Sequence, residues 1–136
     1  MKWLYRNLYR KKKGFTLVEL MVVIIILAVL TAIAIPSYMA LRNRARVAAA
    51  QSEMKNIATA LELYMADLEA YPPTTFAAME AAVEAGGYMV DVPALDPWSN
   101  AYTYVLAAGS YTLTCIGPDE TAGGADDIII VDGQLQ

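Results

Sequence analysis

The chain has 136 residues, of which 57% are hydrophobic and 18% are charged, and its net charge is −4. This length is sufficient for one domain with an appendage. The chain contains no histidine, so the commonest general base and any Ser/His or Cys/His catalytic pair are absent. Its single cysteine, Cys115, excludes an intramolecular disulfide and is expected to be a buried residue of a strand. These features argue against an enzyme.

The net charge conceals a division along the chain. Residues 1–14 carry six basic residues and no acid, whereas the remainder carries four basic residues and all 14 acids. No lysine or arginine follows Lys55. A basic surface for nucleic acid is therefore missing from the part of the chain that is expected to fold.

An apolar segment, residues 15–35, follows the basic leader. As a helix, with a rise of about 1.5 Å per residue, it would span roughly 30 Å, the thickness of a bilayer core. A secretory signal peptide also begins with basic and then apolar residues, but this apolar segment is longer than a signal core and no small-x-small cleavage site follows it. We therefore expect a transmembrane anchor, with the leader in the cytoplasm and the residues beyond about 36 on the opposite side.

Glu19 places a carboxylate inside this apolar segment, where a charge is costly without a partner. In the first turn of a helix the carboxylate is favoured by the helix dipole. A single helix has no comparable way to neutralise it, whereas a bundle of such helices can pair it with an amino terminus. Glu19 therefore predicts self-association.

The residues Gly14, Phe15 and Thr16-Leu17-Val18-Glu19, placed between a basic leader and an apolar helix, resemble the class III signal of type IV pilins and type II secretion pseudopilins. The resemblance implies that a prepilin peptidase cuts between Gly14 and Phe15 and methylates the new amino terminus at Phe15. It also implies that Glu19 sets the register of assembly between subunits. The alternative is a plain signal anchor that carries an accidental glutamate.

The helical pattern continues beyond the apolar segment as an amphipathic stripe. Its apolar members recur at steps of three and four, at Val47, Ala50, Met54, Ile57, Ala58, Leu61, Met65 and Leu68. We expect one helix over 15–70, because Tyr71-Pro72-Pro73 disfavours helix at the residues before the prolines. Pro36 lies inside it and predicts a kink or a melted turn near Leu30–Pro36, either as a segment that unwinds in a filament or as a simple bend at the membrane exit.

Residues 71–136 are expected to form a small globular domain. Thr74 or Thr75 is expected to cap a second helix that runs through Ala85 and ends before Gly86-Gly87. Strands are expected at 102–106, 111–116 and 128–131, the first two joined as a hairpin. The predicted fold class is α+β: a long N-terminal transmembrane and amphipathic helix, packed on a small C-terminal antiparallel sheet as in type IV pilins.

Three local patterns narrow the resemblance to the major pseudopilin of type II secretion. They are Leu95-Asp96-Pro97-Trp98-Ser99-Asn100-Ala101-Tyr102, Gly117-Pro118-Asp119 and Gly123-Gly124-Ala125-Asp126-Asp127-Ile128. The end of the chain departs from that family, since Ile-Ile-Val stands where Asn-Trp is expected. Within the first pattern, Trp98 is expected to cover the core rather than to bind a partner.

The acidic loop 117–127 is a candidate calcium site. Hard oxygen donors suit Ca²⁺, although the spacing is not that of an EF-hand and a solvated acidic turn is the common alternative. The resemblance implies calcium here, with Asp119, Asp126 and Asp127 as ligands and Glu120 only solvated. A bound cation would also relieve repulsion between copies of the acidic domain.

The expected function is that of a structural subunit that polymerises into a helical homo-oligomeric pseudopilus and acts in protein export across the outer membrane. The alternative is a subunit of a surface pilus used for adhesion, motility or DNA uptake. The implied partners are minor pseudopilins, an inner-membrane assembly platform and the prepilin peptidase. The expected location is the bacterial inner membrane, with a single span and a periplasmic C-terminal domain.

Overall fold

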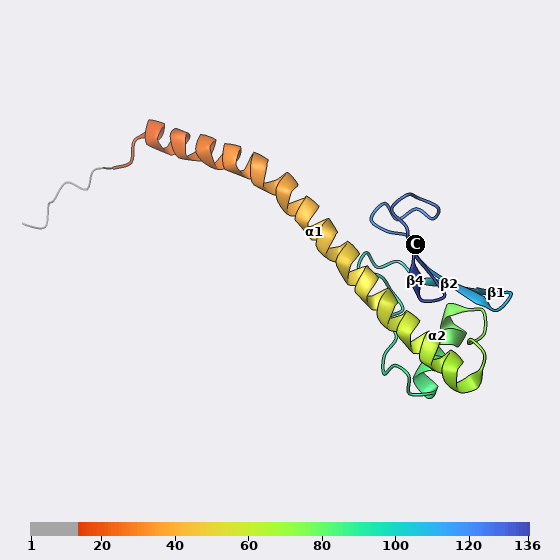
Figure 1. Ribbon diagram of the computed structural model, residues 1–136. Coiled ribbons are helices and arrows are strands. Elements are labelled where there is room, and N and C mark those ends of the chain that lie inside the picture. The colour runs from red at the N-terminus through yellow and green to blue at the C-terminus, as the bar shows by residue number, and fades with distance from the viewer. Residues whose placement is uncertain (1–13) are drawn as a thin grey trace, which may run out of the picture. The chain divides into compact units, whose positions relative to one another are not determined.

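The computed structural model describes residues 14–136. Residues 1–13, which form most of the predicted leader, lie outside the described residues. The chain divides into two compact units at Ala40 and Leu41. In chain order the elements are α1 (Leu17–Leu68), α2 (Phe76–Ala85), β1 (Thr103–Ala107), β2 (Ser110–Cys115), β3 (Ile128–Val131) and β4 (Gln134–Leu135) (Figure 1). The chain thus has the expected α+β fold.

Helix α1 runs without interruption for 52 residues, with Pro36 inside it. The melted turn that Pro36 predicts is therefore not present. Proline removes only one backbone hydrogen bond from the helix, and the residues on both sides keep a helical backbone. Up to Ala40 the side chains of α1 are exposed and overwhelmingly apolar, and by length and composition this helix is able to cross a membrane.

The second unit is built on one face of α1. Its buried positions recur at helical spacing, at Ala50, Met54, Ile57, Ala58, Ala60 and Leu61. Most of the predicted amphipathic stripe is therefore confirmed. The exception is Leu68, which is 56% exposed in the final turn, where α1 leaves the core.

Helix α2 begins and ends as the sequence predicts. Thr75 is its N-cap, with an extended backbone and a hydroxyl that accepts a hydrogen bond from the Ala78 N–H at 3.2 Å. At the other end the Gly86 N–H donates to the Ala82 carbonyl. The buried side chains of α2 are Met79 and Val83, so one apolar face joins the core.

The four strands form one antiparallel sheet in the order β1-β2-β3-β4. Ala108 and Gly109, both with positive φ, form the two-residue turn between β1 and β2. Asp132 and Gly133 repeat this geometry between β3 and β4. The last strand was not expected from the sequence, which we interpreted as ending its final strand at Asp132.

Alternating residues of β2 and β3 point into the same core as the buried face of α1. On these two strands the enclosed residues are Tyr111, Leu113, Cys115, Ile128 and Ile130. Tyr102, Tyr104, Val92 and the two buried residues of α2 complete the core, and Trp98 packs against its edge as expected. The core is small, so each enclosed side chain contributes a large share of the stability.

Tyrosine hydroxyls connect three carboxylates of α1 to later parts of the chain. The pairs are Tyr102–Glu53 at 2.7 Å, Tyr71–Glu62 at 3.0 Å and Tyr88–Asp67 at 3.0 Å. Burial, followed by the adjacent Glu62 carboxylate, raises the pKa of Tyr71 to about 12. These tyrosines consequently remain protonated donors at neutral pH, where no lysine or arginine beyond residue 55 is available to pair with the acids.

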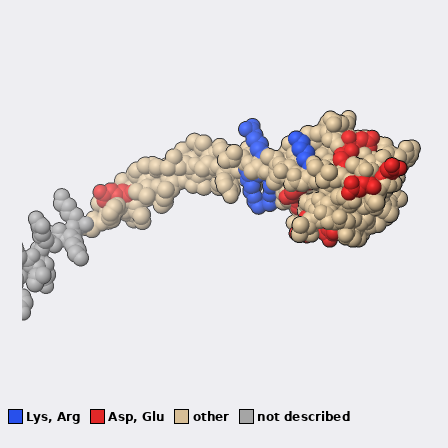
Figure 2. Space-filling view, turned by 60° about the horizontal axis from the view of Figure 1, so that its bottom comes forward, with Lys and Arg blue, Asp and Glu red and all other residues tan. Residues whose placement is uncertain are grey.

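Figure 2 shows how charge is distributed over the described residues. The basic side chains gather around one part of α1, and most acidic side chains lie on the remainder of the second unit. The acidic surface therefore belongs to the globular part of the chain.

The packing of α1 predicts unequal effects for two leucines separated by one residue. Leu61 is fully buried and Leu63 is 51% exposed. Leu61→Ala is expected to lower the free energy of unfolding by about 3 kcal/mol, because it removes buried methyl groups and leaves a cavity. Leu63→Ala, the matched control, is expected to change it by about 0.5 kcal/mol or less. Urea denaturation of the detergent-solubilised chain checks this, and equal effects would contradict the packing described.

Candidate functional site

The two residues at the predicted cleavage position precede the helix. Gly14 and Phe15 are non-helical and exposed, and the Phe15 side chain is 82% exposed. A Cβ atom added to Gly14 would meet no atom within 4 Å. Nothing in the described fold therefore requires glycine at position 14.

Thr16 and Glu19 form a reciprocal cap at the start of α1. The Thr16 N–H and hydroxyl each donate to Glu19 Oε2 at 2.8 Å, and the Glu19 N–H donates to Thr16 Oγ1 at 3.2 Å. This is a capping box, which satisfies backbone donors that the first turn of a helix leaves free. Glu19 was predicted to lie in the first turn of the helix, but its hydrogen bonds with Thr16 were not predicted, although Thr-x-x-Glu is the usual signature of this cap.

The cap occupies only one side of the Glu19 carboxylate. Both hydrogen bonds from Thr16 go to Oε2. The other carboxylate oxygen, Oε1, accepts neither of these two hydrogen bonds. The arrangement fixes the orientation of the carboxylate and leaves one oxygen for a further cation.

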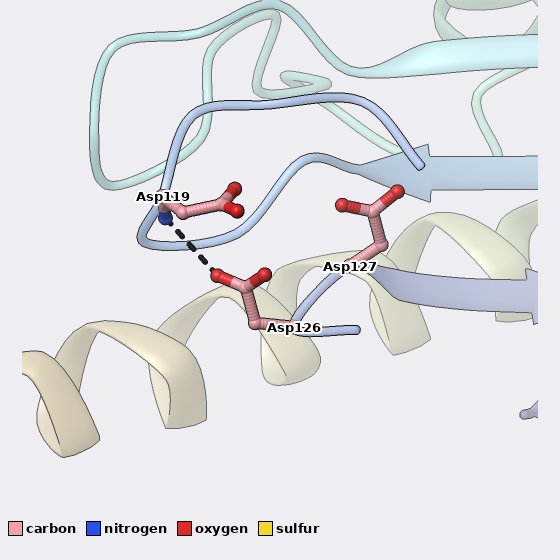
Figure 3. A group of neighbouring side chains, drawn as sticks. All are labelled: Asp119, Asp126 and Asp127. Carbon is pink, nitrogen blue, oxygen red and sulfur yellow. Dashed lines mark hydrogen bonds between the residues drawn. The ribbon is translucent and has the colours of Figure 1, made fainter. Parts of the chain in front are cut away.

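The three predicted metal ligands come together in the loop between β2 and β3. Asp119, Asp126 and Asp127 each offer a carboxylate oxygen, and these oxygens lie within 4.8 Å of one another (Figure 3). Asp119 is exposed, and the other two are half-buried. Glu120 is exposed and not part of this group.

Backbone N–H groups hold one oxygen of each aspartate. Asp119 N–H donates to Asp126 Oδ2 at 3.0 Å, Thr121 N–H to Asp119 Oδ1 at 2.9 Å, and Gly123 N–H to Asp127 Oδ2 at 2.8 Å. The opposite oxygen of Asp127, Oδ1, is buried and has no hydrogen-bond partner among the described residues. A buried carboxylate oxygen without a partner is costly, and a cation would satisfy it.

Two glycines allow the loop to close around these carboxylates. A Cβ at Gly124 would lie 2.7 Å from Asp126 Oδ1 and 3.1 Å from Asp119 Oδ2, so these two oxygens face the same small space. Gly117 has a φ of +68°, and a Cβ there would collide with the Asp126 carbonyl. The donor set consists of hard oxygens, as Ca²⁺ requires, and the residues present fit that ion.

Among residues 14–136, Asp96 is the one acidic residue buried in the core, at 5% exposure. Its Oδ1 accepts the N–H groups of Trp98 and Asn100, each at 2.9 Å, and so fixes the turn that follows. Its Oδ2 accepts the Cys115 thiol at 3.3 Å. Asp96 belongs to the first of the three sequence patterns, and its part as the acceptor that holds this turn was not predicted.

Comparison with known proteins places the chain in a family. The family model described as "Type II secretion system (T2SS), protein G" matches residues 37–132, and the "Prokaryotic N-terminal methylation motif" matches residues 9–35. The chain belongs to the type II secretion system protein G family. The first match contains the acidic loop, and the second contains Gly14, Phe15 and Glu19.

Curated relatives in the protein G family cover most of the chain. "Type II secretion system core protein G" of Pseudomonas aeruginosa is 36% identical over 132 residues, 87% of this chain and 92% of the relative. The protein of the same name from Escherichia coli is 38% identical, over 87% of this chain and 90% of its own length. That from Aeromonas hydrophila is 33% identical, over 88% and 92%. No solved structure gave a significant match.

The buried thiol of this protein G family member predicts low reactivity. Burial raises the pKa of Cys115 to about 11, and the adjacent Asp96 carboxylate also opposes thiolate formation. At pH 8 the folded chain is therefore expected to react with an aromatic disulfide reagent at least tenfold more slowly than the urea-unfolded chain. Absorbance of the released thiolate gives the rate. Equal rates in the two states would show that Cys115 is accessible, contrary to its burial.

Proposed function

We propose that the chain is the major structural subunit of a type II secretion pseudopilus and acts in protein export across the outer membrane. The observation that carries this proposal is the presence of both family patterns in one chain, the methylation motif over residues 9–35 and protein G over 37–132. The relatives carry the name of the secretion system, which favours secretion over the surface pilus. The role is architectural, with no catalytic step assigned to the chain.

The chain would mature by loss of residues 1–14. The peptide bond between Gly14 and Phe15 lies in an exposed, non-helical segment next to the helix cap, where a membrane-bound peptidase has access to it. Since nothing in the fold requires glycine at position 14, its role is assigned to recognition by that peptidase. Methylation would then modify the new amino terminus at Phe15.

Glu19 would provide the register between subunits in the membrane. Cleavage creates an ammonium group at Phe15, one residue before the Thr16 cap. The Thr16 hydrogen bonds hold the Glu19 carboxylate by Oε2. In a low-dielectric bundle its other oxygen would accept the ammonium of an adjacent subunit, which would neutralise both charges.

The proposed location is the bacterial inner membrane, with the leader in the cytoplasm and the second unit in the periplasm. The apolar part of α1 supports membrane anchorage. Polymerisation would occur with minor pseudopilins on an inner-membrane assembly platform, after processing by the prepilin peptidase.

Assembly can be tested with three single variants in cells that carry the secretion machinery. Glu19→Ala is expected to reduce pseudopilus formation at least tenfold, because the intersubunit pair is lost. Thr16→Val is expected to reduce it less, because the carboxylate and its bond from the residue-16 N–H remain and only the hydroxyl bonds are lost. Thr31→Val is the matched control, since the Thr31 hydroxyl only donates to the Leu27 carbonyl within α1.

Filaments are quantified by shearing and immunoblotting, and the intact mass of the membrane-extracted subunit shows whether it begins at a methylated Phe15. Wild-type assembly of Glu19→Ala would contradict the register role. A wild-type subunit that retains Met1 where the peptidase is active would contradict the proposed maturation.

We further propose that Asp119, Asp126 and Asp127 hold a calcium ion. The proposal is supported by the convergence of their oxygens, the buried Asp127 Oδ1 without a partner, and the space beside Gly124. The ion would neutralise the loop and hold the connection between β2 and β3 in one conformation.

Calcium is expected to raise the melting temperature of the wild-type chain by about 5 °C or more over that measured in EGTA. Asp127→Asn is expected to abolish most of this increase. Glu120→Gln removes one negative charge from the same loop, outside the cluster, and is expected to retain the increase. Differential scanning fluorimetry in detergent provides the measurement. The site would be refuted by the absence of a calcium-dependent shift in the wild-type chain.

A further inference from the structure

Helix α1 carries three arginines shortly after the apolar segment. Arg42 and Arg44 are exposed, and Arg46 is half-buried. No acidic residue occurs between Glu19 and Glu53, so no carboxylate on neighbouring turns can neutralise them. Their location on the proposed periplasmic flank runs against the usual bias, which concentrates lysine and arginine in the cytoplasm. Such a placement calls for an anionic partner.

The distribution of these residues around the helix favours a partner that surrounds it. At about 100° per residue, Arg46 lies roughly 40° from Arg42, whereas Arg44 lies about 160° away on the opposite side. The three guanidinium groups thus form a collar rather than a stripe. A protein docked on one side would meet only part of this collar, whereas lipid headgroups can approach from every side that the second unit leaves open.

The position along α1 brings the collar near the headgroup layer. Arg42, Arg44 and Arg46 lie seven, nine and eleven positions after Ile35, about 10 to 17 Å along the helix, whereas the headgroup layer extends roughly 5 to 8 Å beyond each side of the hydrocarbon, so their long side chains must reach back to it. Side chains on a helix lean toward its N-terminus, here toward the apolar segment. Tyr38, which is 67% exposed, lies one turn before Arg42, at the level where interfacial tyrosines occur.

Acidic residues of a second copy are the competing partner for the collar, and the test below separates them from lipid. Within residues 14–136, most of them already accept hydrogen bonds from their own chain. They include Glu53, Glu62, Asp67, Glu84, Asp96, Asp119, Asp126, Asp127 and Asp132. Phosphodiester groups are free in the adjacent leaflet, and a guanidinium group binds them through two parallel hydrogen bonds.

We propose that Arg42, Arg44 and Arg46 form a binding collar for anionic phospholipid headgroups in the leaflet that the second unit faces. The collar holds the unassembled subunit at a fixed depth in the membrane. This inference rests on the membrane anchorage proposed above but not on pseudopilus assembly, so the two can fail separately.

The test uses the full chain in nanodiscs of phosphatidylcholine with phosphatidylglycerol, and native mass spectrometry of the lipids it retains. Wild-type chain is expected to retain phosphatidylglycerol preferentially. Arg44→Gln is expected to reduce this preference about fivefold, and the triple glutamine variant to remove the part not due to the leader. Lys55→Gln, which removes one charge from the same helix beyond the collar, is the matched control and is expected to leave it unchanged.

Changing all three arginines to lysine is expected to retain a reduced preference, because lysine keeps the charge without the two parallel hydrogen bonds. This variant also serves if the glutamine variants fail to fold. The proposal is overturned if the triple glutamine variant keeps the wild-type preference, or if Lys55→Gln reduces it as much as Arg44→Gln. It is also overturned if the triple variant keeps its lipid preference but loses crosslinking between subunits, which would indicate pairing with a second copy. Failure of the wild-type chain to enter nanodiscs would instead contradict the membrane anchorage.

Discussion

The sheet and α2 depend on the buried face of α1, because the enclosed side chains of all three belong to one cluster. Met54, Ile57 and Leu61 have no exposed surface, and Ala50 and Ala60 allow the rest of the chain to approach the helix closely. A domain of this size has little apolar surface to bury, so it cannot form its core without the helix. The apolar segment and the buried face that organises the core therefore belong to the same helix.

The carboxylates of the second unit accept hydrogen bonds from neutral groups, because no lysine or arginine follows Lys55. Tyrosine hydroxyls bind Glu53, Glu62 and Asp67, and backbone N–H groups bind Asp96. Hydrogen bonds from neutral donors stabilise a carboxylate without cancelling its charge. Three carboxylates converge in the loop between β2 and β3, where hydrogen bonds alone leave their charges unneutralised. A divalent cation is therefore proposed there.

Much of the fold could be predicted because the relevant signals are local. Periodicity predicted the buried face of α1, Thr75 and Gly86 marked the limits of α2, and the pattern of β-branched and aromatic residues marked three strands. The fourth strand was missed because its two residues are exposed and give no pattern, although Asp132-Gly133 is a hairpin signal. Of the kink or melted turn predicted near Leu30–Pro36, the melted turn was wrong, because one missing hydrogen bond does not outweigh the intact turns around it, and the kink stays a prediction.

The candidate sites were predicted less completely. The three aspartates were identified by composition and resemblance, and the structure brings their oxygens together. The Thr16–Glu19 cap was missed because the apolar surroundings made the charge of Glu19 the more prominent feature. The acceptor role of Asp96 was missed because only the folded turn brings the N–H groups of Trp98 and Asn100 onto one oxygen.

The continuity of α1 has a mechanical consequence. The apolar segment and the buried positions Ala50–Leu61 belong to the same helix, Leu17–Leu68, so a pull on the segment acts on the element that carries the core. Because interiors are close-packed, side chains that interdigitate there must be displaced together rather than one at a time. A subunit drawn out of a bilayer by its helix would thus carry its folded domain with it as a single load.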